Sequence, residues 1–129
     1  MSSFRFASIA MLAGLALAGC SLKNTYEKEA DKITRAVIAD DTRAVAAELS
    51  PGLAAQVTAV KVAVLSDELK AAGEYRGIKE NDQNCPPAKH CFDVRFSNHP
   101  YREVLAMDDR QKVSSWYVHE GAPGTAIGQ

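Results

Sequence analysis

The sequence contains no hydrophobic run long enough to cross a membrane. Its most apolar stretch, Ser8 to Ala18, has about a dozen residues, whereas a spanning helix needs about 20. Charge is balanced as well, with 15 Lys and Arg against 16 Asp and Glu, which gives no support for nucleic-acid binding. The chain also has no nucleophile elbow, phosphate loop or dinucleotide fingerprint. The sequence therefore favours a non-catalytic protein over an enzyme, and no cofactor is expected.

The N-terminus has the layout of an export signal. Residues 1–7 carry one positive charge, Arg5, and no acid, and the apolar stretch that follows ends in Leu17-Ala18-Gly19-Cys20. This ending resembles the lipobox of bacterial lipoproteins. The resemblance implies cleavage after Gly19 and a diacylglyceryl (palmitate-type) lipid on the Cys20 sulfur. The alternatives are an ordinary secretory signal followed by a free thiol, or an apolar start that arose by chance.

Residues 1–19 are thus predicted to be a signal peptide, and 20–24 a lipidated tether. A single domain is expected over 25–120, with a flexible tail over 121–129. Cleavage would leave 110 of the 129 residues, with a net charge of −2 once Arg5 is removed. Ser21 follows the anchor where an Asp would resemble an inner-membrane retention signal. We therefore expect a periplasm-facing location, on the outer membrane rather than the inner.

The three cysteines divide into one plus two. With Cys20 taking lipid, Cys85 and Cys91 remain as an even pair in an oxidising compartment, which predicts a disulfide. The bond would fix a proline-rich loop. The rival hypothesis is a redox or zinc site that uses these two cysteines with His90, but the spacing fits neither pattern.

The first half of the chain has helical periodicity. Asn24 and Glu27 form a capping-box pattern ahead of a first helix, whose inward side chains recur at spacings of three and four. A short helix is expected over Thr42–Leu49. Ser50 and Pro51 then start a long helix that ends near Ala71. Its predicted apolar stripe consists of Leu53, Val57, Val60, Val64 and Leu69, with Leu65 beside it.

After Gly73 the period changes from 3.6 to 2, which predicts four strands joined by turns. They are expected at 74–79, 92–96, 101–107 and 113–119. Helices followed by strands indicate an α+β fold, here N-terminal helices packed on a curved antiparallel sheet. One face of that sheet is expected to pack on the long helix.

The chain resembles the cone-shaped α+β domains of the nuclear transport factor 2-like (cystatin-like) superfamily. The resemblance rests on Leu49-Ser50-Pro51 before a long helix, on Gly73 before a sheet, and on the ending from Leu105 to Val118, with Trp116-Tyr117-Val118 in its last strand. It implies a curved sheet around the long helix, with a pocket between them. Some members are isomerases or dehydratases, and many only bind a partner or dimerise through the sheet.

Candidate pocket residues are Asp93, Arg95 and Glu103. Asp93 and Arg95 alternate with apolar neighbours, so they lie on the opposite face of their strand. If that polar face is concave, the three residues could line a pocket; if it faces solvent, they are ordinary surface charges, which is the favoured interpretation. The three histidines show no ligand spacing, so no metal site is expected.

Three functional hypotheses remain. The first is a lipid-anchored, non-catalytic binding module that engages a periplasmic protein, another envelope component or a second copy of itself. The second, a particular version of the first, is an inhibitor or immunity protein against a toxin that reaches the periplasm. The third is a small-molecule site, isomerase- or dehydratase-like, between helix and sheet. A buried carboxylate with a raised pKa would favour chemistry, whereas an exposed aromatic or apolar face would favour a protein partner.

Overall fold

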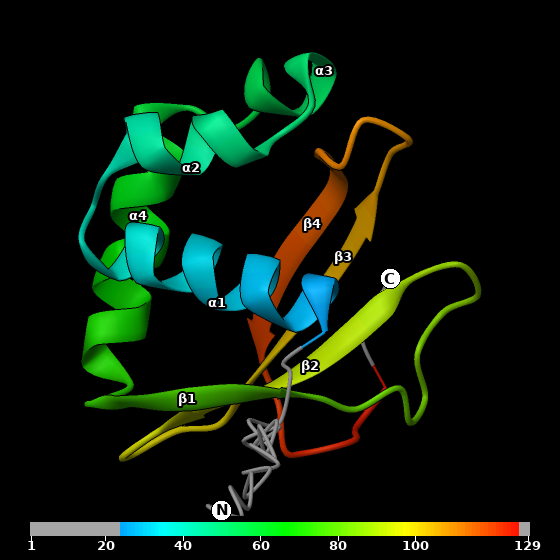
Figure 1. Ribbon diagram of the computed structural model, residues 1–129. Coiled ribbons are helices and arrows are strands. Elements are labelled where there is room, and N and C mark those ends of the chain that lie inside the picture. The colour runs from blue at the N-terminus through cyan, green and yellow to red at the C-terminus, as the bar shows by residue number, and fades with distance from the viewer. Residues whose placement is uncertain (1–23, 127–129) are drawn as a thin grey trace, which may run out of the picture.

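Four helices are followed by a four-stranded antiparallel sheet in a computed structural model, which describes residues 24–126 (Figure 1). The predicted signal peptide, Cys20 and most of the tether lie outside the described residues, as do residues 127–129. The helices gather on one side of the sheet, and this confirms the predicted α+β class. No helix within the described range is long and apolar enough to cross a membrane.

The helices are α1 (Thr25–Ile38), α2 (Thr42–Glu48), α3 (Pro51–Ala54) and α4 (Ala59–Ala71). Asn24 caps α1 by accepting the Glu27 N–H at 2.8 Å, as the sequence predicted. The Glu27 side chain does not complete a capping box, because it accepts the Glu80 N–H from β1. Asp41 caps α2 through the Ala44 N–H, which satisfies a free donor at the helix start.

The single long helix expected from Pro51 to Ala71 is divided in two. Residues 55–58 leave the helical path, and Thr58 caps α4 by accepting the Lys61 N–H at 3.3 Å. The break resets the helical phase, so the predicted stripe was wrong at two positions: Val60 is 73% exposed and Val64 54% exposed. Leu69 is buried as predicted, and Val62 and Ser66 complete the buried face of α4.

The strands are β1 (Tyr75–Glu80), β2 (His90–Phe96), β3 (Tyr101–Met107) and β4 (Val113–Glu120). They pair in sequence order, β1-β2-β3-β4, which is the predicted meander. Gly73 precedes the sheet with φ +105°, a backbone conformation that favours glycine, and an added Cβ would lie 2.0 Å from Ser97 Oγ.

The core lies between α1 and one face of the sheet. α1 crosses the sheet and contacts β1, β2 and β3, while α4 packs against α1 (Figure 1). The sequence predicted that the long helix packs on the sheet. The structure places α1 there instead, with Ala30, Ile33 and Val37 on its buried face. The sheet supplies Phe92, Val94 and Leu105 to the same core.

Candidate functional site

The structure does not bring Asp93, Arg95 and Glu103 together. Glu103 pairs with Phe92 across β2 and β3, so the two side chains lie on the same, helix-facing side of the sheet. Asp93 and Arg95 lie on the outer face, since side chains alternate along a strand. Register between strands, which the sequence did not reveal, therefore separates Glu103 from the other two.

The outer face is partly covered rather than open. Asp93 lies 3.3 Å from the Nε atom of Arg102, a fully buried arginine on β3. Arg102 also donates to the carbonyls of Asn81, Gln83 and Thr125. It thereby ties the β1–β2 loop and the segment after β4 to the sheet. Arg95 is exposed and donates to the Arg76 carbonyl.

Residues 121–126 were expected to begin a flexible tail, but they are held against this outer face. The Gly124 N–H donates to Asp93 Oδ1 at 3.0 Å, and Asn84 Nδ2 donates to the Gly124 carbonyl at 2.8 Å. Gly124 has φ +70°, and a Cβ there would lie 2.4 Å from Gln83 Oε1. The remainder of the predicted tail lies outside the described residues.

The predicted disulfide between Cys85 and Cys91 is present, with Cα atoms 5.8 Å apart. It joins the β1–β2 loop to β2. Cys91 is buried beside Val104 on the outer face, where Cys85 packs against them. The bond therefore fixes the loop that Arg102 also holds.

Glu103 is a fully buried carboxylate. Thr34 Oγ1 on α1 donates to its Oε2 at 2.7 Å, and Trp116 Nε1 on β4 donates to its Oε1 at 2.7 Å. Burial raises the pKa of Glu103 to about 7, although the two hydrogen bonds lower it and the nearby carboxylates of Asp31 and Glu29 raise it. Both oxygens already accept a hydrogen bond.

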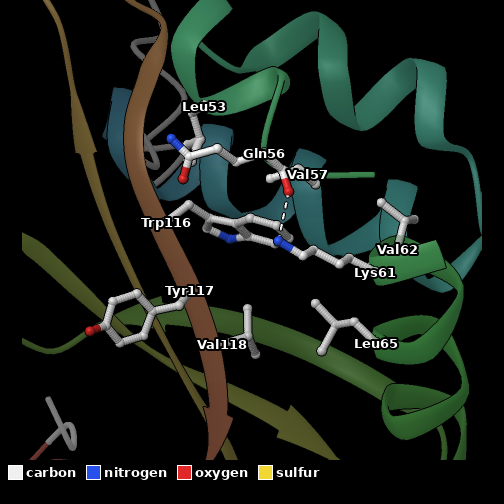
Figure 2. Close-up of a pocket in the computed structure, with 9 residues that line it drawn as sticks. All are labelled: Leu53, Gln56, Val57, Lys61, Val62, Leu65, Trp116, Tyr117 and Val118. Atoms are coloured by element: carbon white, nitrogen blue, oxygen red, sulfur yellow. Dashed lines mark hydrogen bonds between the residues drawn. The ribbon is translucent and has the colours of Figure 1, made fainter. Parts of the chain in front are cut away.

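Trp116 also lines an apolar pocket of about 300 Å³ (Figure 2). It lies between β4 and the helical segment from α3 to α4. Figure 2 shows the indole ring pointing from β4 toward the helices, while Tyr117 points to the opposite side of the strand. The lining residues are Leu53, Gln56, Val57, Lys61, Val62, Leu65, Trp116, Tyr117 and Val118.

The pocket adjoins an open sheet edge. The Gly121 N–H donates to the Pro100 carbonyl of the β3 side at 3.0 Å. Because such bonds alternate along an antiparallel pair, the backbone groups of Trp116 and Val118 point away from β3. Within residues 24–126, the helical region covers the start of this edge, where the Ser50 N–H donates to the Val113 carbonyl.

Lys61 gives the pocket its charge. Its ammonium group donates to the Gln56 carbonyl at 2.9 Å across the pocket mouth (Figure 2). No acidic side chain is among the residues that line the pocket in the described part of the chain. Within the described part of the chain, the pocket thus combines apolar walls, one cation and backbone donors and acceptors of β4 that no further strand of the sheet pairs with.

The three histidines have different neighbours. His99 is exposed near Glu120, and His119 lies near the end of β4. His90 Nδ1 lies 3.1 Å from Glu80 Oε1, and one ligand atom from each of Glu80, Asp82 and His90 lies within 4.8 Å of the others. Sequence spacing did not indicate this group, because the β1–β2 hairpin brings Glu80 next to His90 from ten residues away.

A pocket between helix and sheet was expected from the resemblance, but the residues expected to line it, Asp93, Arg95 and Glu103, are not among those that do. Trp116 and Tyr117, which the sequence places in the last strand, both line the pocket. Charged residues and prolines commonly protect an edge strand from pairing with another chain. The last strand has neither between Val113 and Val118. The helix break that forms the opposite wall has no comparably clear signal.

No family model, curated protein or solved structure matches this chain. The resemblance to the nuclear transport factor 2-like superfamily therefore stays a prediction, and the functional argument depends on the site itself.

Proposed function

We propose that the mature chain is a lipid-anchored, periplasm-facing envelope protein that binds an extended segment of a protein partner at β4. The anchor follows from the lipobox-like Leu17-Ala18-Gly19-Cys20, with Ser21 favouring the outer membrane. The observation that carries the binding proposal is the apolar pocket beside the open edge of β4. A binding module of this kind requires no chemistry of its own.

An extended segment is the occupant that suits this edge. A strand added beside β4 would pair with the backbone groups of Trp116 and Val118, and its alternate side chains would point into the pocket. An exposed aromatic residue beside the pocket supports an interface: Tyr117 is 43% exposed.

The charge at the pocket indicates which residues the partner segment carries. Lys61 lies at the mouth of a pocket that no acid lines, so an acidic residue beside the apolar side chains of the partner is favoured over a basic one. We propose an extended segment in which apolar and acidic residues alternate.

The position of Glu103 supports binding over catalysis. A general acid or base must reach its substrate within hydrogen-bond distance. Glu103 is fully buried behind Trp116, and Thr34 and Trp116 occupy its two oxygens. Its raised pKa is thus a property of the core, with no path from the carboxyl group to the pocket.

Site-specific photo-crosslinking in intact cells tests the binding proposal. A photoreactive phenylalanine analogue replaces Tyr117 at the open edge, and the matched control replaces exposed Lys79 on the opposite edge strand, β1. We expect adducts from position 117 alone, with a segment of another envelope protein that alternates apolar and acidic residues. Adducts only with lipid, with a second copy of this chain, or equally from both positions would contradict the proposal.

A strand-blocking pair tests the mode of binding. Val118→Pro removes a backbone donor that points away from β3, so the β3–β4 hydrogen bonds remain. Val118→Ala trims the same side chain and keeps the donor. We expect the crosslink from position 117 to disappear in the proline variant and to persist in the alanine variant. An undiminished crosslink in the proline variant would exclude strand addition.

A further inference from the structure

Glu80, Asp82 and His90 meet where β1 leads into the β1–β2 loop and β2 begins. Each offers one ligand atom, and the three atoms lie within 4.8 Å of one another. Glu80 and His90 are half-buried, and Asp82 is exposed, so the group is reachable from solvent. It lies outside the groove at β4, and what it binds does not depend on the proposed function.

The separation of the donor atoms suits a metal ion. Two ligands at about 2.1 Å from a cation lie about 3.0 Å apart in octahedral geometry and about 3.4 Å apart in tetrahedral geometry. Glu80 Oε1 and His90 Nδ1 are 3.1 Å apart. A cation between them would need only a small movement of either side chain, with Asp82 approaching from the loop.

Secondary contacts hold the three ligands in place. Asn24 Nδ2 donates to the other oxygen of Glu80, and the Cys91 N–H donates to Asp82 Oδ1 at 3.2 Å. The His90 ring stacks on Tyr26 with centroids 3.5 Å apart, which orients its nitrogens. Contacts of this kind fix metal ligands in known sites and reduce the cost of ordering them on binding.

Two carboxylates, those of Glu80 and Asp82, meet at this place. No ion pair between described residues joins a lysine or arginine to Glu80 or Asp82, and the partner of Glu80 is His90. The Glu27 carboxylate lies beside them, since it accepts the Glu80 N–H at 3.1 Å. A divalent cation would neutralise this charge.

The loop that carries Asp82 is also fixed at two further points. The Cys85–Cys91 disulfide closes it onto β2, and Arg102 binds the carbonyls of Asn81 and Gln83 on either side of Asp82. Asp82 is therefore presented from a constrained backbone.

We propose that Glu80, Asp82 and His90 form a site for a divalent first-row transition metal, with Zn²⁺ as the best-suited ion. One imidazole and two carboxylates supply three protein ligands, and water completes the coordination. Imidazole favours Zn²⁺ over Mg²⁺ or Ca²⁺, which prefer oxygen ligands alone.

Titration calorimetry with Zn²⁺ tests the site. The full chain is used with Cys20→Ser, which removes the thiol outside the disulfide as a competing ligand. Asp82→Asn keeps an acceptor for the Cys91 N–H but loses the charge, and His90→Gln removes the imidazole. The matched controls are Asp109→Asn in the β3–β4 turn and His119→Gln on β4.

We expect one Zn²⁺ per chain, with affinity reduced at least about tenfold in the Asp82 and His90 variants and unchanged in both controls. The ring proton signals of His90 should shift on addition of Zn²⁺, while those of His99 stay in place. Circular dichroism confirms that each variant is folded. An absence of binding up to millimolar Zn²⁺, or equal affinity in folded Asp82→Asn and the parent, would overturn the proposal.

Discussion

Glu103 places an ionisable group inside an otherwise apolar core. Its carboxyl group is fully buried, and burial raises its pKa to about 7 from the ordinary value of 4.5. The hydrogen bonds from Thr34 and Trp116 oppose this shift because they favour the charged form. The helix above the sheet and the last strand are thus joined through one side chain.

Glu103 makes the stability of the domain depend on pH. Between pH 4.5 and about 7 the folded state holds a proton on Glu103 that the unfolded state has lost. The contribution of Glu103 to stability is therefore greatest below pH 4.5 and falls as pH rises to about 7, by an amount on the order of 3 kcal/mol. Glu29 adds to the same trend, since burial and the adjacent Glu48 raise its pKa to about 7.

Glu103→Gln should reduce this pH dependence, because an amide can accept from Trp116 and donate to Thr34 without titrating. We expect urea unfolding between pH 4.5 and 8 to show a shallower fall in stability for the variant, with a residual slope from Glu29. Equal slopes for the parent and the variant would show that Glu103 does not titrate in this range.

At the scale of elements, helix positions depended on signals that the sequence displays only in part. The cap at Asn24 was predicted because its residue type is diagnostic. The break before Thr58 was missed because residues 51–71 contain good helix formers on both sides of it. A shift of phase at that point moved Val60 and Val64 from the predicted core to the surface.

Arg102 should be required to hold two peripheral segments on the sheet. Arg102→Met leaves the half-buried Asp93 without its cation and three carbonyls without a donor. We expect a loss of about 3–5 kcal/mol in urea unfolding, and faster proteolysis within residues 81–89 and 121–126. The matched control is Arg95→Met on the same face, where the arginine is exposed and the change should stay within about 0.5 kcal/mol.

A similar stability loss for Arg102→Met and Arg95→Met would contradict the assigned role of Arg102. Unchanged proteolysis in the Arg102 variant would show that the two segments are held by other contacts.

The disulfide should contribute a smaller amount. Cys85→Ala opens a short ring, and the chain-entropy estimate for such a ring is about 2 kcal/mol. We expect a lower melting temperature for Cys85→Ala with membrane attachment unchanged, because Cys20 is untouched. A thiol assay on the parent should find neither Cys85 nor Cys91 reactive; two reactive thiols would contradict the bond.

For the whole molecule, the fold class and the strand order could be predicted from the sequence. Alternating side chains and short turns indicate a meander, and the meander is observed. The sequence could not show which face of the sheet each polar side chain occupies, because contacts between residues distant in sequence determine this. Glu103 accepts a hydrogen bond from Thr34, and Arg102 donates one to the Thr125 carbonyl. The pocket depends on the same kind of contact, between β4 and a helix some 50 residues earlier.

In the proposed arrangement, lipid on Cys20 joins the domain to a membrane. Two acyl chains hold a protein stably on a bilayer, where one chain binds marginally. Held at that surface, the open edge of β4 would meet partners in the same envelope. The binding proposal and the metal proposal can each fail separately, but the location depends on the anchor alone.

Metabolic labelling with an alkyne analogue of palmitate tests that anchor most directly. Bacterial cells produce the parent chain, Cys20→Ser and, as the matched control, Cys85→Ser. We predict label in the membrane fraction for the parent and the control, on a polypeptide whose mass corresponds to an N-terminus at Cys20. We predict no label for Cys20→Ser. Label that is unchanged in Cys20→Ser, or a parent chain found unlabelled and uncleaved in the cytosol, would contradict the account.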